Sequence, residues 1–185
     1  MINTLDELKI RLRNIFPNIQ ESCEKCRYPD CRGYIHLLEE EVDSLLNDDI
    51  SVVCLNESVY LIDSFRRRED GNLDLTEFSP KCRLRCQNGD CSIHEKKPLI
   101  CLSYPIIIDR YQDGKDYWVF HKQCQYYDDV SNTGQKEEII NSYMKLIDEV
   151  SPELKANIKE AYYAYSSVVS SNYTDWDLEL IKEVK

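Results

Sequence analysis

Cysteine is the residue type that most constrains how this chain can fold. The 185-residue sequence contains 9 cysteines, and 8 of them stand in closely spaced groups or follow such a group. Thiolate sulfurs bind zinc ions and iron–sulfur clusters, and closely spaced cysteines bring two sulfurs to one ion with little bending of the backbone. The sequence therefore predicts a fold organised around metal. The expected metal ligands are Cys23, Cys26, Cys31, Cys82, Cys86, Cys91, Cys101 and Cys124.

The spacing of these cysteines leaves the type of metal centre open. Cys23 and Cys26 are separated by two residues, which is the strongest indication of a shared ion. The run from Cys82 to Cys101 lacks the close pairs of a zinc finger, and no closely spaced histidine pair accompanies it. Thiolates in this number can complete two four-ligand sites, or one site with spare cysteines for redox chemistry or catalysis. A [4Fe-4S] iron–sulfur cluster and zinc both fit, and the pairing of the sulfurs stays open.

The three histidines and the ninth cysteine have simpler interpretations. His36 stands in an apolar, strand-like context and is expected to pack there. His94 lies near a cysteine group, and His121 is the better candidate for a further ligand or an acid–base group. A structural hydrogen-bonding role is nevertheless favoured for each histidine. Cys54 belongs to an apolar run, so we expect it to be a small buried hydrophobic residue.

The sequence also predicts a cytoplasmic protein with reduced thiols. Its first residues show neither the basic start nor the apolar stretch of a secretory leader, and the cysteine count is odd. Both features favour metal binding over a disulfide scaffold. The longest apolar stretch, residues 105–108, is far too short to cross a membrane.

Charge limits the possible partners. The formal net charge of −11 disfavours nonspecific nucleic-acid binding, because the phosphate backbone would be repelled. The same charge would attract a basic peptide or protein, which is the partner we expect. The sequence leaves the oligomeric state open.

Hydrophobic periodicity predicts an α+β fold. A capping box at Thr4 and Glu7 starts an amphipathic helix that stops near Pro17. The cysteine groups are expected in loops at residues 21–33 and 82–101. Further helix is expected at residues 39–46, and Asp70 is expected in a turn. Strands are expected at residues 34–38, 50–55, 59–65, 106–111 and 116–121.

The last third of the chain has a different pattern. Apolar residues recur at helical spacing from Ile139 to Val150, and Ser151 then provides a helix cap before Pro152. A short final helix is expected near residues 174–184. We therefore predict a small, loop-rich, metal-centred domain with short β-hairpins at residues 1–130. An all-helical C-terminal extension at residues 131–185 is expected to pack on it.

One stretch resembles a known family signature. The signature reads Cys-x-Ile-Tyr-x-x-Arg-Pro-x-x-Cys-Arg-x-Tyr/Phe-Pro. The matching residues here are Cys91, Ile93, Pro98, Cys101, Tyr104 and Pro105, with His94 and Lys97 in place of the usual tyrosine and arginine. The signature belongs to a family of cysteine-cluster domains described as zinc- or iron-chelating, which includes flagellin lysine N-methylase-like proteins. The resemblance covers residues 22–124. Cys31 departs from it, because family members usually carry adjacent cysteines after the first pair.

This resemblance implies a cytosolic protein with a cysteine-ligated iron–sulfur or zinc centre. In better-understood family members the centre is linked to methylation of lysine on a protein substrate. A methyl-donor site usually needs a glycine-rich turn, and the glycines here are isolated from one another. A methyltransferase role would therefore need an unusual donor site.

Two functions from different classes follow. The first is an iron–sulfur protein that acts in redox chemistry or in modification of a peptide or protein substrate, lysine methylation being one such reaction. The alternative is a zinc-stabilised protein-interaction module without catalysis. A thiol–disulfide oxidoreductase that uses Cys23 and Cys26 is disfavoured, because such a pair normally begins a helix after a strand. The sequence assigns no catalytic residue and no site for an organic cofactor.

Overall fold

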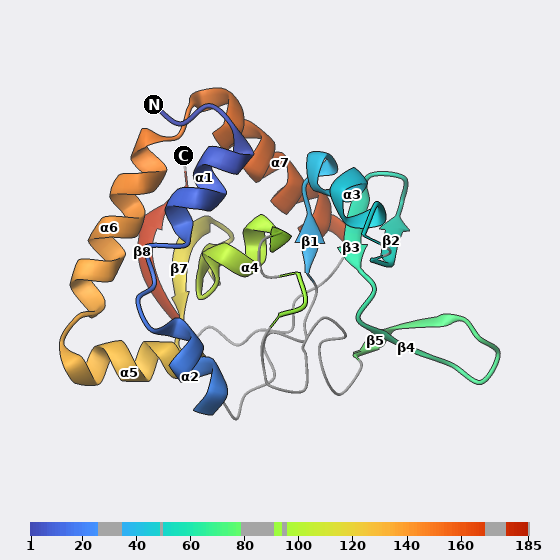
Figure 1. Cartoon of the computed structure of the whole chain (residues 1–185), viewed down its shortest axis with the longest axis horizontal. Coiled ribbons are helices and arrows are strands. Elements are labelled where there is room, and N and C mark those ends of the chain that lie inside the picture. Colours follow the sequence, from blue (N-terminus) through green and yellow to red (C-terminus); the bar gives the residue numbers. More distant parts are fainter. Residues whose placement is uncertain (26–34, 49, 79–90, 94–95, 169–176, 185) are drawn as a thin grey trace.

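The computed structural model describes residues 1–25, 35–48, 50–78, 91–93, 96–168 and 177–184. Figure 1 shows the arrangement of the helices and strands in these segments. The helices are α1 (Leu5–Leu12), α2 (Ile19–Lys25), α3 (Glu39–Leu46), α4 (Leu99–Ser103), α5 (Gln125–Thr133), α6 (Lys136–Glu149) and α7 (Pro152–Val168). The strands are β1 (His36–Leu37), β2 (Val52–Leu55), β3 (Val59–Ile62), β4 (Phe65–Arg67), β5 (Leu73–Phe78), β6 (Ile106–Arg110), β7 (Asp116–His121) and β8 (Leu178–Glu183).

The strands form small antiparallel sheets, which confirms the predicted α+β class. The strand orders in the described part of the chain are β1-β3-β2, β4-β5 and β6-β7-β8. The predicted hairpins are present. The β2–β3 turn places Asn56 and Glu57 at φ values of 50° and 60°, and the β6–β7 turn places Gly114 at 79°. The turn predicted at Asp70 is also present, and the Asp70 carboxylate accepts a hydrogen bond of 2.9 Å from the amide of Asn72.

The main core lies between the β6-β7-β8 sheet and helices α1, α5 and α6 (Figure 1). Helix α1 begins as predicted, because the hydroxyl of Thr4 accepts a hydrogen bond of 3.3 Å from the amide of Glu7. Its residues at helical spacing, Leu5, Leu8 and Leu12, are buried. Their spacing gives the helix one apolar face, and burial of that face stabilises it against the core.

The N-terminal segment is tied to the junction between α6 and α7. The amide of Ile2 donates to the carbonyl of Glu149, and the carbonyl of Ile2 accepts from the amide of Ser151, both at 2.8 Å. Ser151 also caps α7, since its hydroxyl accepts from the amide of Leu154 at 3.2 Å. The predicted start of α7 is thereby confirmed, and the first residues of the chain complete the same core as the C-terminal helices.

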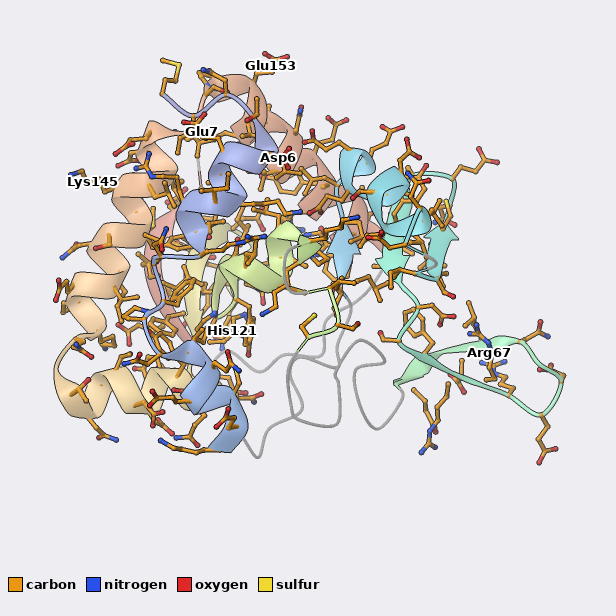
Figure 2. The ribbon with its side chains drawn as sticks, in the orientation of Figure 1. Asp6, Glu7, Arg67, His121, Lys145 and Glu153 are labelled. Atoms are coloured by element: carbon orange, nitrogen blue, oxygen red, sulfur yellow. The ribbon has the colours of Figure 1, made fainter. Side chains whose placement is uncertain are left out.

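A second unit is built on the β1-β3-β2 sheet. On one face of β3, Ile62 packs in a cluster with Val42 and Leu45 of α3. On the other face, Leu61 packs in a cluster with Tyr165 of α7. This alternation follows from the strand period of two, so α3 and α7 cover opposite faces of the sheet. The β4–β5 ribbon extends away from both units (Figure 1), and Arg67 projects from it (Figure 2).

The expectation of an all-helical C-terminal segment is wrong. Residues 178–183 form strand β8, which pairs antiparallel with β7 from His121↔Leu178 to Tyr117↔Glu183. A segment this short with Leu178, Leu180 and Ile181 is compatible with either helix or strand periodicity. The edge of β7 offers it a hydrogen-bonding partner, and this long-range pairing decides the outcome. Within the described residues, no helix has the combination of length and apolar character needed to cross a membrane.

Candidate metal centre

Cys23 lies on α2 and not in the loop that the sequence predicted. Asn18 adopts a left-handed φ of 58°, and the helix begins at the next residue. The loop prediction relied on proline and glycine further along the chain. Residues 19–25 themselves include Gln, Glu and Lys, which favour helix. Cys23 is half-buried in this helix.

Helix α2 is anchored to α5 through one charged hydrogen bond. The hydroxyl of Ser22 donates to the carboxylate of Asp129 at 2.6 Å, and Ser22 is buried. Gln125 also donates to this carboxylate, at 3.1 Å. These hydrogen bonds, with that of Ser22 the stronger influence, hold the pKa of Asp129 below its ordinary value. The contact brings the helix that carries Cys23 against the helix that starts directly after Cys124.

Cys124 occupies the start of α5, just past β7, as the predicted hairpin requires. It is buried, with 8% of its surface exposed. Its amide donates to the carbonyl of His121 at 3.2 Å, and its carbonyl accepts from the amide of Tyr127 at 2.9 Å. The side chain of Tyr126 lies nearby. Burial raises the pKa of Tyr126 to about 12, and Cys124 adds to this rise.

Cys101 lies on α4, so part of the second cysteine group is also helical. The start of α4 is held by Glu41, a buried residue of α3. The Glu41 carboxylate accepts from the amide of Leu99 at 2.7 Å, from the amide of Leu38 at 3.1 Å and from the ammonium of Lys9 at 2.9 Å. A single carboxylate thus connects α1, α3 and α4, and fixes where Cys101 sits.

Helix α4 forms the junction between the two apolar units. Leu99 belongs to the main core, whereas Ile100 and Cys101 pack against the cluster of the second unit. Cys91 packs against that same second cluster. Cys124 belongs to the main core. The described cysteines of the predicted ligand set therefore lie on both sides of this junction.

A polar cluster borders the same junction. The rings of Tyr104, at the end of α4, and His121, at the end of β7, have centroids 5.5 Å apart. His121 lies inside the fold (Figure 2), and the carboxylates of Asp109 and Asp177 are buried as well. Burial lowers the pKa of His121 to about 4, although Asp177 opposes this shift. The imidazole is therefore uncharged at neutral pH, and its 3.6 Å contact with Asp109 is not an ion pair.

The described residues supply only part of the predicted ligand set. Among them, no three His, Cys, Asp or Glu side chains come close enough together to hold one metal ion. Four predicted ligands, Cys26, Cys31, Cys82 and Cys86, lie outside the described residues, and so does His94. Two of these cysteines are close in sequence to described ligands: Cys26 directly follows the end of α2, and Cys86 precedes Cys91 by five residues. A thiolate site would have to combine cysteines from both sets.

Cys54 and His36 do not belong to the predicted ligand set, and a buried position was expected for Cys54 and a packing role for His36. Cys54 is exposed, so the prediction that it is buried is wrong. Strand β2 is an edge strand. Val53 and Leu55 pack against the cluster on the α7 face, whereas Cys54 lies on the α3 face and is not among the residues that pack against the cluster there. His36 packs as predicted, with its ring stacked on Tyr165 at a centroid distance of 4.8 Å. Burial lowers the pKa of His36 to about 4.

Comparison of the chain with protein-family models, with curated proteins and with solved structures finds no match. The resemblance to the cysteine-cluster family stays a prediction, carried by the motif at residues 91–105.

Proposed function

We propose that this chain is a cysteine-ligated metal protein with an iron–sulfur cluster. It acts in redox chemistry or in modification of a peptide or protein substrate, of which lysine methylation is one example. One observation carries this proposal most directly: segments far apart in the sequence, each carrying a predicted ligand, are held against one another. Ser22 and Asp129 join the segments of Cys23 and Cys124. Tyr104 and His121 join the segments of Cys101 and Cys124.

The donor chemistry supports this proposal. The predicted ligands Cys23, Cys91, Cys101 and Cys124 are all soft sulfur donors, and sulfur donors select zinc and iron–sulfur clusters over hard cations such as magnesium. Buried apolar surroundings, as at Cys124, favour a neutral thiol over a bare thiolate. Ligation to a cation removes that cost, because the metal stabilises the deprotonated sulfur. An iron–sulfur cluster, when bound, would supply one-electron chemistry.

The surroundings would control such a centre in two ways. The apolar residues of both units limit access of water, which influences the reduction potential of a bound cluster. The acidic net charge of −11 would attract a basic segment of a substrate protein. One cavity, lined by Leu8, Ser103 and Tyr143 among others, measures about 40 Å³ and is far smaller than the several hundred Å³ that a nucleotide-sized methyl donor needs. A methyl-transfer role would therefore require a donor site elsewhere.

A zinc-stabilised interaction module is the second candidate, and the position of α4 favours it. Cys101 and Cys124 lie on either side of the junction between two modest apolar clusters. A metal ion that linked these segments would stabilise the relative position of the two units without any catalysis. In that case the acidic surface would serve to bind a basic partner.

Purification without oxygen distinguishes the two candidates. The proposal predicts a brown protein with stoichiometric iron and acid-labile sulfide, and with visible absorption that bleaches on addition of dithionite. A colourless protein that retains zinc after extensive dialysis would replace it with the interaction module. A protein with neither metal after anaerobic expression, and with no uptake on reconstitution with iron and sulfide or with zinc, would refute both.

A further inference from the structure

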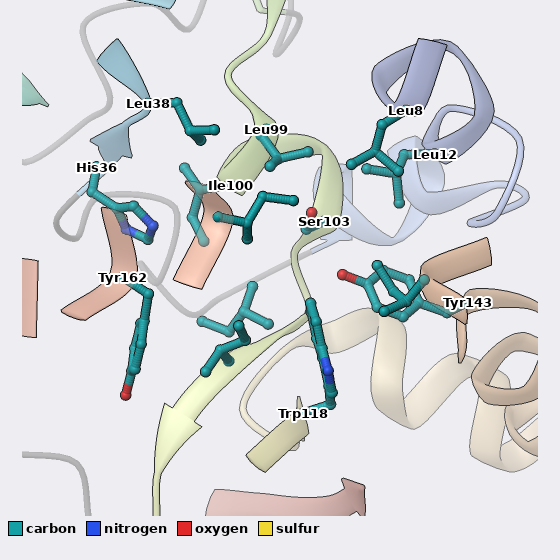
Figure 3. Close-up of a pocket in the computed structure, with 14 residues that line it drawn as sticks. Leu8, Leu12, His36, Leu38, Leu99, Ile100, Ser103, Trp118, Tyr143 and Tyr162 are labelled. Carbon is teal, nitrogen blue, oxygen red and sulfur yellow. The ribbon is translucent and has the colours of Figure 1, made fainter. Parts of the chain in front are cut away.

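A small cavity lies between α1, α4, α6 and β7 (Figure 3). Its volume is about 40 Å³, and most of its lining is apolar, with Leu8, Trp118 and Ile147 among the contributing residues. Ser103 and Tyr143 are polar residues at one end of it, and His36 and Tyr162 line the other end. Figure 3 shows the hydroxyl of Tyr143 on the side of its ring that faces Ser103.

The hydroxyl of Tyr143 is the unusual feature of this cavity. Tyr143 is 0% exposed, and within the described part of the chain no group of suitable distance and angle accepts a hydrogen bond from its hydroxyl. Ser103 lies near enough to oppose the rise that burial causes in the pKa of Tyr143, yet the two hydroxyls do not form a hydrogen bond of normal geometry. Native proteins rarely leave a buried hydroxyl without a partner, because its lost hydration is costly.

The size and polarity of the cavity indicate its occupant. A cavity needs about 10 to 15 Å³ of space to hold a water molecule, which in turn needs two to four polar partners, whereas a dry apolar cavity that binds benzene measures about 150 Å³. The volume here is about 40 Å³, which suits one water molecule and is too small for an organic ligand of benzene size. Tyr143 and Ser103 supply the polar partners. We propose that this cavity holds one ordered water molecule that bridges the hydroxyls of Tyr143 and Ser103.

This water would connect α4 to α6. Ser103 is the last residue of α4, two positions after Cys101, and Tyr143 lies in the middle of α6. The bridge would fix the C-terminal end of α4, while Glu41 fixes its start. The inference does not depend on any metal, so it can hold even where the proposed function fails.

Direct detection of the water provides the first test. A crystal structure at high resolution is expected to show an ordered water within hydrogen-bond distance of both hydroxyls. A crystal of the same protein pressurised with xenon is expected to show no xenon there. Xenon in the cavity, or a direct hydrogen bond between Tyr143 and Ser103 with no water between them, would overturn the proposal.

Substitutions give an independent test through the sign of their effect. Tyr143→Phe is expected to lower the urea midpoint, because it removes one partner of a satisfied water. Adding Ser103→Ala is expected to lower the midpoint little further, because both changes disrupt one bridge. If the cavity were dry, Tyr143→Phe would raise the midpoint by removing an unsatisfied hydroxyl, and the proposal would fail. Tyr126→Phe is the matched control, since the Tyr126 hydroxyl is also buried but does not line the cavity.

Discussion

The hydroxyl of Ser22 donates a 2.6 Å hydrogen bond to the carboxylate of Asp129, across 107 positions of sequence. This contact holds α2, which carries Cys23, against α5, which starts directly after Cys124. It is therefore one of the contacts through which the fold brings predicted ligands from separate cysteine groups together.

Removal of this hydrogen bond should loosen α2. Ser22→Ala is expected to lower the free energy of unfolding by about 1 kcal/mol, because a hydrogen bond to a charged group is lost at a partly buried position. Hydrogen exchange of the α2 amides should become faster. Ser131→Ala, the same change at an exposed position of α5, serves as the control. Unchanged exchange in α2 would show that this contact does not anchor the helix.

Glu41 should be among the most sensitive polar positions for stability. Glu41→Ala would leave the buried amide of Leu99 and the ammonium of Lys9 without their acceptor. We expect a loss of about 3 kcal/mol in unfolding free energy, as for other buried charged networks that lose one member. Urea denaturation followed by circular dichroism measures this loss. Glu40→Ala, at the exposed neighbour, should change the midpoint little, and an equal loss in both variants would contradict the assigned role.

Glu179 should make the attachment of β8 dependent on pH. Burial alone would raise the pKa of this carboxyl, but hydrogen bonds from Lys136 and Tyr127 outweigh burial and keep the pKa below its ordinary value. Its stabilising contribution is therefore complete above the unfolded-state pKa of about 4.3. It is lost as the pH falls through the lower, folded-state pKa.

Hydrogen exchange and denaturation can check this contribution. Glu179→Gln is expected to cost about 0.5 to 1 kcal/mol at pH 7, a modest value because solvent screens the ion pair. Exchange of the β8 amides should become faster in the variant at pH 7, and the difference from the parent protein should shrink below pH 4. A difference that stayed constant down to pH 3 would rule out the carboxylate as its source.

Cys101 and Cys54 should differ sharply in their effect on metal content. Cys101→Ser removes a predicted ligand at the junction of the two units, so the variant is expected to lose most of its metal and become less soluble. Cys54→Ser changes an exposed thiol on an edge strand, and metal content should be unaffected. Metal analysis of both purified variants provides the comparison. A soluble Cys101→Ser protein with full metal content would remove this residue from the ligand set.

Local signals made much of the fold predictable. The caps at Thr4 and Ser151 and the glycine turn at Gly114 act through neighbouring residues, so the sequence alone locates the elements that they start or connect. Strand β8 was missed because its structure depends on pairing with β7, about 60 positions earlier in the chain. Helix α2 was missed because the prediction gave more weight to the proline and glycine that follow it than to its own modest helix preference.

The expected ligands of the candidate site were predictable from the sequence, but the contacts that hold their segments in place were not. Cysteine spacing identifies the expected ligands without any structure. By contrast, nothing near Glu41 in the sequence indicates that its carboxylate accepts from Leu99, 58 positions away. Ser22 and Asp129 are even further apart in the sequence, at 107 positions. Such contacts exist only after folding, and an acidic run such as residues 39–41 has the same appearance whether its members are exposed or buried.

X-ray absorption at the edge of the metal retained by anaerobically purified protein tests the central claim most directly. The account predicts a first coordination shell made of sulfur, at about 2.3 Å for thiolate ligands. For the proposed iron–sulfur cluster, an additional iron–iron scattering contribution is expected, whereas zinc with sulfur alone would indicate the interaction module. A shell dominated by nitrogen or oxygen, or protein that retains no metal, would contradict a cysteine-ligated centre.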